Sequence, residues 1–301
     1  MPASAKAPSP PVRLLVEKLT QDAFAPFGTV IENPLRTPGY SPGHLYTGAP
    51  GSAKEGPSRT RPVSANRGTA LRFNDVSPVD SLYRLAPSRK RARVTTTMFV
   101  CTPRDLSAVA DSSDASKSFS IEILERHPFT TQTFIPIGLA TVDRESSYLV
   151  IVAPTLPTSK PKGARPPPFP TPEPRRRRSL KEVLSGARPP PFPERPLDSK
   201  PSENTRKALP GPGLPDLLNC KAFIANGSQA VTYAAGTWHA PMAVLGAKPL
   251  EFVVVQYANG VAEEDCQEVE LAADGSEQGL FAHISAATPG WGGLKLPSAK
   301  L

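Results

Sequence analysis

The segment ILERHPFTTQTFIPIG, residues 123 to 138, contains two runs of β-forming residues on either side of a proline. Three ionisable residues, Glu125, Arg126 and His127, follow one another at the end of the first run. Alternate side chains of a strand point to opposite faces, so Glu125 and His127 share one face and a regular strand directs Arg126 to the other. Gln132 and Phe134 likewise share a face of the second run. The segment predicts β structure in which polar groups gather where a strand ends.

Similar β-rich runs, bounded by Pro, Gly, Asp or Ser, occur along most of the chain. They cover residues 95–103, 119–127, 130–138, 147–155, 220–226, 228–236, 242–246 and 250–258. Helical periodicity is scarce, and only 20–24 and 75–82 are expected to form short helices, each beginning near a residue that could cap it. Many short strands joined by tight turns predict an all-β jelly roll or another double-sheet barrel.

The positive charge of the chain is concentrated in one segment. The whole sequence of 301 residues has a net charge of +8, and residues 157–216 contain 13 Lys and Arg against 6 Asp and Glu, which leaves about +1 elsewhere. The same segment holds 17 of the 38 prolines and repeats GARPPPFP at 163–170 and 186–193. Such a composition cannot bury enough apolar surface to fold. We interpret 157–216 as a disordered Pro/Arg-rich insertion, so the basic charge does not indicate nucleic-acid binding.

A single catalytic domain, interrupted once, is therefore expected over 13–156 and 217–272, with a disordered N-terminus (1–12) and a flexible C-terminal tail (273–301). No apolar run approaches the ~18 residues of a membrane helix, and the first residues do not resemble a secretory signal, so no membrane association is expected. The three cysteines, Cys101, Cys220 and Cys266, show no Cys-x-x-Cys pairing. They are expected to be reduced thiols rather than a disulfide framework or a zinc ribbon.

A second polar segment, YAAGTWHAPM at 233–242, places His239 just after a glycine turn at a strand end. Ionisable side chains at the mouth of a barrel occupy a natural ligand position. Two simpler interpretations stay open at this point. Glu125 and His127 could form a solvated strand-end pair, and His239 could simply pack on Trp238.

Longer segments of the chain are similar to those of a known family. ILERHPFTTQTFIPIG, YLVIVAP, AAGTWHAPM, FVVVQYANG and EEDCQEVEL, together with LTQDAFAPFGTVIE (19–32) and ANRGTALRF (65–73), resemble the ureidoglycolate lyase family in its fungal form. The resemblance covers roughly 14–156 and 217–271. It implies a cupin-like double-stranded β-helix, often a homodimer, that cleaves (S)-ureidoglycolate to glyoxylate and urea in allantoin and purine catabolism.

This chemistry requires a general base for the substrate hydroxyl and a general acid for the leaving nitrogen. The ordinary pKa of histidine lies near working pH, so His127 and His239 are expected to fill these two roles, while Glu125 is expected to orient one of them or tune its charge. No cofactor is predicted. Glu125, His127, Gln132 and His239 could in principle converge on Zn²⁺ or Mn²⁺, but the chain has only 4 histidines. A divalent metal stays possible and is not predicted.

Substrate-binding residues are expected among the remaining polar groups of the matched segments. Arg72 is expected to bind the substrate carboxylate through its two-pronged guanidinium, with Arg126 as the second choice. Gln132 and Asn66 are amides suited to the ureido group, and Trp238 would supply an apolar wall. An alternative for Arg72 is an exposed charge at a strand end.

Two other functions and a location complete the expectations. The chain could act on another small ureido or hydroxy acid, or it could be a binding barrel whose ARPPPFP repeats are ligands for SH3-type domains. The last three residues, Ala299, Lys300 and Leu301, resemble a Ser-Lys-Leu peroxisomal address, which an import receptor reads. A peroxisomal location is therefore expected, with the cytoplasm as the alternative.

Overall fold

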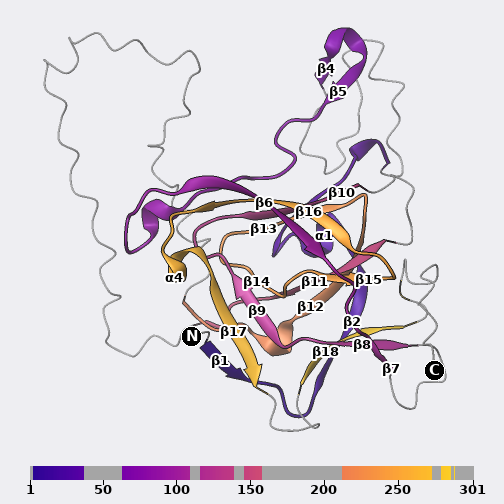
Figure 1. Cartoon of the computed structure of the whole chain (residues 1–301), viewed down its shortest axis with the longest axis vertical. Coiled ribbons are helices and arrows are strands. Elements are labelled where there is room, and N and C mark those ends of the chain that lie inside the picture. Colours follow the sequence, from indigo (N-terminus) through magenta and orange to yellow (C-terminus); the bar gives the residue numbers. More distant parts are fainter. Residues whose placement is uncertain are drawn as a thin grey trace, which may run out of the picture.

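The computed structural model describes residues 3–36, 63–108, 116–138, 146–157, 212–272, 279–285 and 288. These residues form two large β-sheets that lie in layers, together with a two-stranded hairpin (Figure 1). Strands dominate, and the two α-helices described are each 4 residues long. The predicted all-β architecture is confirmed, and the curled sheets fit a cupin-like barrel.

The larger sheet has eleven strands in the order β1-β17-β9-β14-β11-β12-β2-β18-β8-β7, with β15 paired to β11. Its strands are β1 (Ala3–Lys6), β2 (Val12–Lys18), β7 (Ser107–Ala108), β8 (Lys117–Ser120), β9 (Ile123–Arg126), β11 (Ser147–Ala153), β12 (Lys221–Asn226), β14 (Trp238–His239), β15 (Ala243–Leu245), β17 (Gln267–Ala272) and β18 (Leu280–Ile284).

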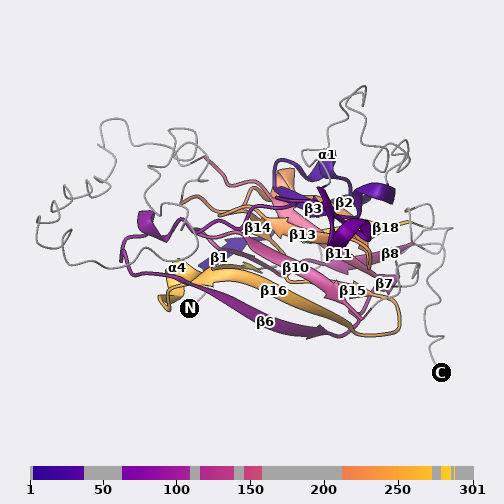
Figure 2. The same cartoon turned by 90° about the horizontal axis from the view of Figure 1, so that it is seen from above.

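The smaller sheet has five strands in the order β3-β13-β10-β16-β6, and Figure 2 shows β10, β16 and β6 side by side. Its strands are β3 (Gly28–Ile31), β6 (Arg93–Cys101), β10 (Gln132–Ile137), β13 (Ala230–Tyr233) and β16 (Leu250–Ala258). The hairpin consists of β4 (Val63–Ala65) and β5 (Ala70–Arg72). The helical turns are α1 (Gln21–Phe24), α4 (Ala262–Asp265), η1 (Pro34–Arg36), η3 (Asn66–Gly68), η4 (Tyr83–Leu85) and η5 (Leu217–Asn219).

Strand β11 shows how the two layers are held together, because all of its residues are buried. Leu149 and Ile151 face a core built only from the curled larger sheet, which we call the curled-sheet core. Tyr148 and Val150 face the other way, into a core between the two sheets that we call the inter-sheet core. A continuous apolar run, rather than an alternating one, is what a strand covered on both faces requires.

The helix expected near residue 20 is present as α1, where the Thr20 side chain accepts a hydrogen bond of 3.3 Å from the Ala23 N–H. The helix expected over 75–82 is absent, and this prediction is wrong. Ser77 instead donates to the Thr232 hydroxyl at 2.6 Å, and the Asp80 N–H donates to the Thr131 hydroxyl at 2.9 Å. These bonds to the smaller sheet hold the segment in a non-helical path.

Both expected tails contain a strand, which corrects the predicted boundaries at 1–12 and 273–301. Strand β1 pairs in parallel with β17, and β18 pairs with both β2 and β8. In β18 the alternate residues Leu280, Ala282 and Ile284 are buried in the curled-sheet core. This apolar alternation is the physical reason why the segment packs against the barrel rather than trailing from it.

The predicted insertion at 157–216 lies largely outside the described residues, but the strands that flank it are neighbours. β11 and β12 pair antiparallel over six residue pairs, from Ser147 with Asn226 to Val152 with Lys221. The Leu156 N–H also donates to the Leu214 carbonyl at 2.8 Å. The chain therefore leaves and re-enters the barrel at adjacent points. Within the described part of the chain, neither α-helix has the length and apolar character needed to cross a membrane.

Candidate active site

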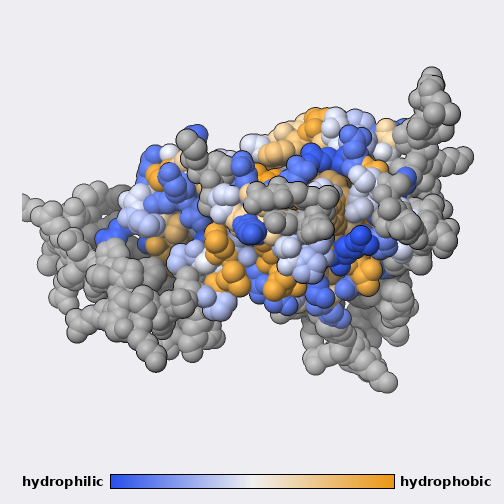
Figure 3. Space-filling model, turned by 90° about the horizontal axis from the view of Figure 1, so that it is seen from below, coloured by the Kyte–Doolittle hydropathy of each residue, from blue (hydrophilic) through white to orange (hydrophobic). Residues whose placement is uncertain are grey.

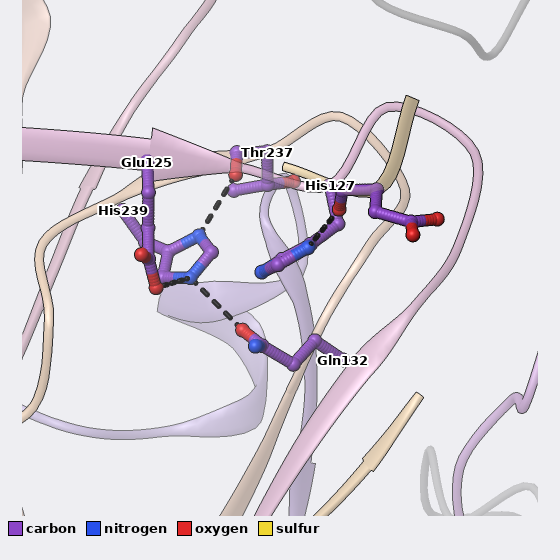
Figure 4. A network of polar contacts seen from close by, with 6 residues as sticks. Glu125, His127, Gln132, Thr237 and His239 are labelled. Atoms are coloured by element: carbon purple, nitrogen blue, oxygen red, sulfur yellow. Dashed lines mark hydrogen bonds and ion pairs between the residues drawn. The ribbon is translucent and has the colours of Figure 1, made fainter. Parts of the chain in front are cut away.

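Strands β9 and β14 bring the two polar segments of the sequence together. Glu125 of β9 pairs directly with His239 of β14, so both side chains lie on the same face of the larger sheet. Their face looks toward the smaller sheet, where Gln132 begins β10. We call Glu125, His127, Gln132 and His239 the polar cluster (Figure 4).

His239 is the centre of this cluster and is 1% exposed. Its Nδ1 lies 3.0 Å from the Thr237 carbonyl oxygen, which can only accept, so Nδ1 carries a proton. Its Nε2 lies 3.0 Å from Gln132 Oε1 and 3.4 Å from Glu125 Oε1. Both neighbours of Nε2 are oxygen atoms, which accept hydrogen bonds.

His127 is arranged differently, although its ring centroid is only 5.8 Å from that of His239. Its Nδ1 donates to the backbone carbonyl of Asp265, and its buried Nε2 has no hydrogen-bond partner among the described residues. Burial, together with the neighbouring His239, lowers the pKa of His127. The ring is thus neutral at neutral pH and presents the Nε2 lone pair to the space beside His239 (Figure 4).

Glu125 supplies the negative charge of the cluster. Burial alone would raise its pKa, but the hydrogen bond and the attraction to His239 outweigh that cost and lower the pKa. The carboxylate is therefore ionised at neutral pH. The cluster then contains a neutral imidazole, a carboxylate and a second imidazole that can hold a proton beside it. Such a set can remove one proton and deliver another within the same site.

A row of three polar side chains crosses the smaller sheet next to the cluster. Gln132 of β10 pairs with Tyr233 of β13 on one side and with Gln256 of β16 on the other. The Tyr233 ring stacks on His239 at 3.9 Å between centroids. Tyr233 Oη and Gln256 Oε1 are buried atoms without a hydrogen-bond partner in the described structure. Unsatisfied buried polar atoms are costly, so their gathering beside two histidines marks a place for a polar ligand.

The same residues provide ligand atoms for a divalent cation. Glu125, His127 and His239 each offer an atom within 4.8 Å of the other two, and both rings bond backbone carbonyls through Nδ1 and leave Nε2 for the site. Cys266 and Glu268 lie equally close to Glu125. Burial raises the pKa of the Cys266 thiol to about 12, so it stays protonated and is not a ready nucleophile.

Arg126 and Trp238, two of the residues expected to bind substrate, lie on the opposite face from the cluster. The Trp238 ring belongs to the curled-sheet core and donates to the Gly213 carbonyl at 3.3 Å. The Arg126 guanidinium stacks on it at 4.5 Å and donates to Gln267 Oε1 at 2.9 Å. Burial lowers the Arg126 pKa to about 10, so the group stays charged. Strand alternation carries both side chains away from the polar cluster, which argues against their direct contact with substrate.

Arg72 and Asn66 lie on the β4–β5 hairpin, which projects from the barrel in Figure 1. Both are exposed, and the labelled strands β4 and β5 of this hairpin lie away from β9 and β14 in Figure 1. An open pocket of about 660 Å³ lies between the hairpin and the ends of β3, β10 and β13, lined by residues that include Leu71, Phe73 and Ile135. None of the polar-cluster residues lines it. The described structure therefore does not bring Arg72 to the histidines.

Comparison with known proteins decides the family. The ureidoglycolate lyase family matches residues 11–276, which is most of the chain. The chain belongs to the ureidoglycolate lyase family. It is 29% identical over 255 residues to a ureidoglycolate lyase of Schizosaccharomyces pombe, covering 85% of this chain and 90% of the relative. It is also 29% identical over 273 residues to the ureidoglycolate lyase of Saccharomyces cerevisiae, covering 88% and 96%. A Burkholderia cepacia ureidoglycolate lyase is 27% identical over 260 residues, covering 86% of each.

The family match includes two residues of the site that motif reading missed, Tyr233 and Gln256. Tyr233 is the first residue of YAAGTWHAPM (233–242), and Gln256 lies within FVVVQYANG. The available signal was a polar side chain among apolar residues on one face of a strand. Gln256 follows Phe252 and Val254 on the buried face of β16, where an amide without a ligand would be costly.

Proposed function

We propose that this chain is a ureidoglycolate lyase, which splits (S)-ureidoglycolate into glyoxylate and urea. The observation that carries the proposal is the convergence of Glu125, His127 and His239, in a chain that belongs to this family, beside buried polar atoms that have no partner in the described structure. Ureidoglycolate carries a hydroxyl and a urea nitrogen on one carbon. Removing the hydroxyl proton while protonating that nitrogen lets the C–N bond break and a C=O bond form.

The surroundings of the two histidines differ, and this difference supports one as the general base and the other as the general acid. His127 presents a bare Nε2 and is kept neutral by burial, so it is suited to accept the hydroxyl proton. His239 directs Nε2 at the oxygen atoms of Glu125 and Gln132, so a proton on this nitrogen lies beside the carboxylate, and we assign protonation of the leaving nitrogen to His239. The electron pair of the broken C–N bond stays on urea. After release of the products, a proton must pass from His127 back to His239 to restore the starting state.

Recognition of the ureido group falls to the two amides of the smaller sheet. Gln132 and Gln256 are adjacent across β10 and β16, and together they offer donors and acceptors that match those of urea. Neither arginine expected to bind the carboxylate lies at the polar cluster, because Arg72 is on the hairpin and Arg126 is stacked on Trp238. Arg72 is the exposed one of the two, and in this proposal it reaches the carboxylate by a movement of its hairpin.

The products test the proposal. The purified full chain is incubated with (S)-ureidoglycolate, and glyoxylate, urea and ammonia are measured together. A lyase releases glyoxylate and urea in equal amounts, without ammonia. Release of ammonia in place of urea would indicate a hydrolase, and turnover of only another ureido or hydroxy acid, such as ureidoglycine or allantoate, would replace the substrate.

We also propose that the protein is a homodimer that pairs through strand β6. This strand ends the smaller sheet, and its alternate residues Val94, Met98 and Val100 are 55%, 59% and 62% exposed. A long apolar edge strand is a template for pairing, and two antiparallel copies related by a two-fold axis would cover each other. Light scattering on the wild type and on Met98→Lys checks this: a dimer that becomes a monomer supports it, and a monomeric wild type contradicts it.

A peroxisomal location is proposed from Ala299, Lys300 and Leu301, which lie outside the described residues. A fluorescent protein fused to the N-terminus should give puncta that become diffuse when Leu301 is deleted. A diffuse signal with the C-terminus intact would place the protein in the cytoplasm and remove the import receptor as a partner.

A further inference from the structure

The carbonyl that fixes His127 belongs to Asp265, the last residue of helix α4. A backbone carbonyl accepts but cannot donate, so this contact selects the ring form with the proton on Nδ1 and the lone pair on Nε2. The function of His127 as a base depends on that form. Whatever holds the Asp265 backbone therefore controls both the orientation of the ring and the position of its lone pair.

Asp265 is itself held by three donors to its side chain. Its carboxylate accepts from the Tyr83 hydroxyl at 2.7 Å, from the Asn259 N–H at 2.8 Å and from the Gly260 N–H at 2.7 Å. Hydrogen bonds to an ionised acceptor are stronger than neutral ones. Tyr83 is 2% exposed, and burial together with Asp265 raises its pKa, so the phenol keeps the proton that it donates.

The preceding residue, Glu264, ties the same turn to a distant segment. Its carboxylate accepts from the Ser88 N–H at 2.7 Å, from the Ser88 hydroxyl at 2.6 Å and from Asn259 Nδ2 at 2.7 Å. Glu264 is 5% exposed, which is rare for a carboxylate unless all its acceptors are used. The turn 259–265 is thus fastened to residues 83–88 at two successive carboxylates.

We infer that Asp265 and Tyr83 are positioning residues for His127. Tyr83 holds the Asp265 side chain, and the Asp265 carbonyl holds the His127 ring with Nε2 turned into the pocket. Neither residue contacts substrate in this scheme. The ends of the segments FVVVQYANG and EEDCQEVEL form the turn 259–265, which contains the Asp265 carbonyl. The effect on turnover rests on the proposed function, whereas the effect on the ring of His127 does not.

Tyr83→Phe is the sharpest test, because it keeps the buried ring and removes only the hydroxyl, which lies 2.7 Å from the Asp265 carboxylate and 3.1 Å from the Tyr257 carbonyl oxygen. Small errors in the position of a proton-transfer group are costly, so we expect kcat on (S)-ureidoglycolate to fall by at least about tenfold while KM changes by less than about twofold. Tyr148→Phe is the matched control. It also loses a buried phenol hydrogen bond, of 2.7 Å to the Gln229 carbonyl, but Tyr148 lies in the inter-sheet core and does not contact Asp265 or His127. Its kcat should stay near that of the wild type.

A second readout follows the ring directly. The chain has 4 histidines, so ¹⁵N-histidine spectra are simple, and a His127→Asn variant assigns the signal. The wild type should show His127 in the Nδ1–H form, and Tyr83→Phe should shift it toward a mixture of both forms while Tyr148→Phe should not. An unchanged His127 signal in Tyr83→Phe would overturn the inference even if kcat fell. A wild type without turnover on ureidoglycolate would refute the proposed function and leave this spectral test standing.

Discussion

Strands β9 and β14 carry two different environments on their two faces, although the residues concerned are neighbours in sequence. On one face Glu125 and His239 lie 3.4 Å apart, near buried polar atoms without a partner in the described structure. On the other face Arg126 stacks on Trp238 against the curled-sheet core. Alternation along a strand therefore separates a reactive pair from a packed pair. Residue type alone is therefore a poor guide to function here, since the buried arginine is as polar as the groups that we propose transfer protons.

The largest expected effect is on the reactive face. His127→Ala and His239→Ala should each lower kcat by about 10²- to 10⁴-fold, because each removes a proton-transfer group. Steady-state kinetics on the folded variants, with folding checked by circular dichroism, measures this. A folded variant with near-normal kcat would exclude that histidine from the mechanism.

The packed face should respond in stability rather than in turnover. Arg126→Met keeps an apolar stem over Trp238 and removes the charged hydrogen bond to Gln267. We expect the free energy of unfolding to fall by about 1–3 kcal/mol, while kcat stays within about threefold of the wild type. Denaturant unfolding and kinetics on the same preparation test it. A loss of kcat as large as that of the histidine variants would mean that the two faces are not functionally separate.

A smaller effect on kinetics is expected from Gln256, which belongs to the row of three polar side chains across the smaller sheet. Gln256→Ala removes one partner of the ureido group without touching a histidine, so KM should rise by about tenfold, which is the value of one good hydrogen bond. kcat should change less than KM. Thr95→Val on the neighbouring strand is the control, because its hydroxyl bonds only the Gln256 backbone carbonyl, at 3.2 Å. Equal effects of the two variants would indicate a general loss of sheet structure.

Removal of metal should have little effect on activity, because the proposed mechanism needs only proton transfer by the two histidines. Activity should survive dialysis against a chelator, and metal analysis of the active enzyme should find less than one ion per chain. Loss of activity that Mn²⁺ or Zn²⁺ restores would instead make Glu125, His127 and His239 ligands, and the metal would then take over activation of the substrate hydroxyl.

The smallest effect is expected from the insertion. Because β11 and β12 are paired neighbours, residues 158–211 can be replaced by a short Gly/Ser linker between the described ends at 157 and 212. An enzyme should keep its kcat and KM. A protein that instead loses a binding partner and has no turnover of its own would fit the alternative of a barrel that displays SH3-type ligands.

Local patterns predict nine of the 18 described strands and nominate the residues that the structure brings together as the polar cluster. Each expected strand run has a counterpart in the structure, although residues 119–127 are divided between β8 and β9. Glu125 and His127 were placed on one face by alternation, and the turn before His239 put it at a strand end. These features depend on spacing within a few residues, which a sequence shows directly.

The features that were missed depend on pairing between distant segments. The row of Tyr233, Gln132 and Gln256 exists only because β13, β10 and β16 pair in one particular register, which no local pattern specifies. The position of Arg72 on a projecting hairpin and the burial of β18 are equally non-local. A motif can therefore nominate residues for a site, but the register of the sheets decides which of them meet.

The pH dependence of kcat/KM tests the central claim most directly. A base works only when unprotonated, so activity is present above its pKa and is lost as pH falls through it. Burial lowers the pKa of His127 from its ordinary value of 6.5, so the wild type should keep full activity at neutral pH and lose it only below pH 6.5. The residual activity of His127→Ala should lack this acid limb. An acid limb that persists unchanged in His127→Ala, or one that lies above pH 6.5 in the wild type, would contradict the assignment of His127 as the base.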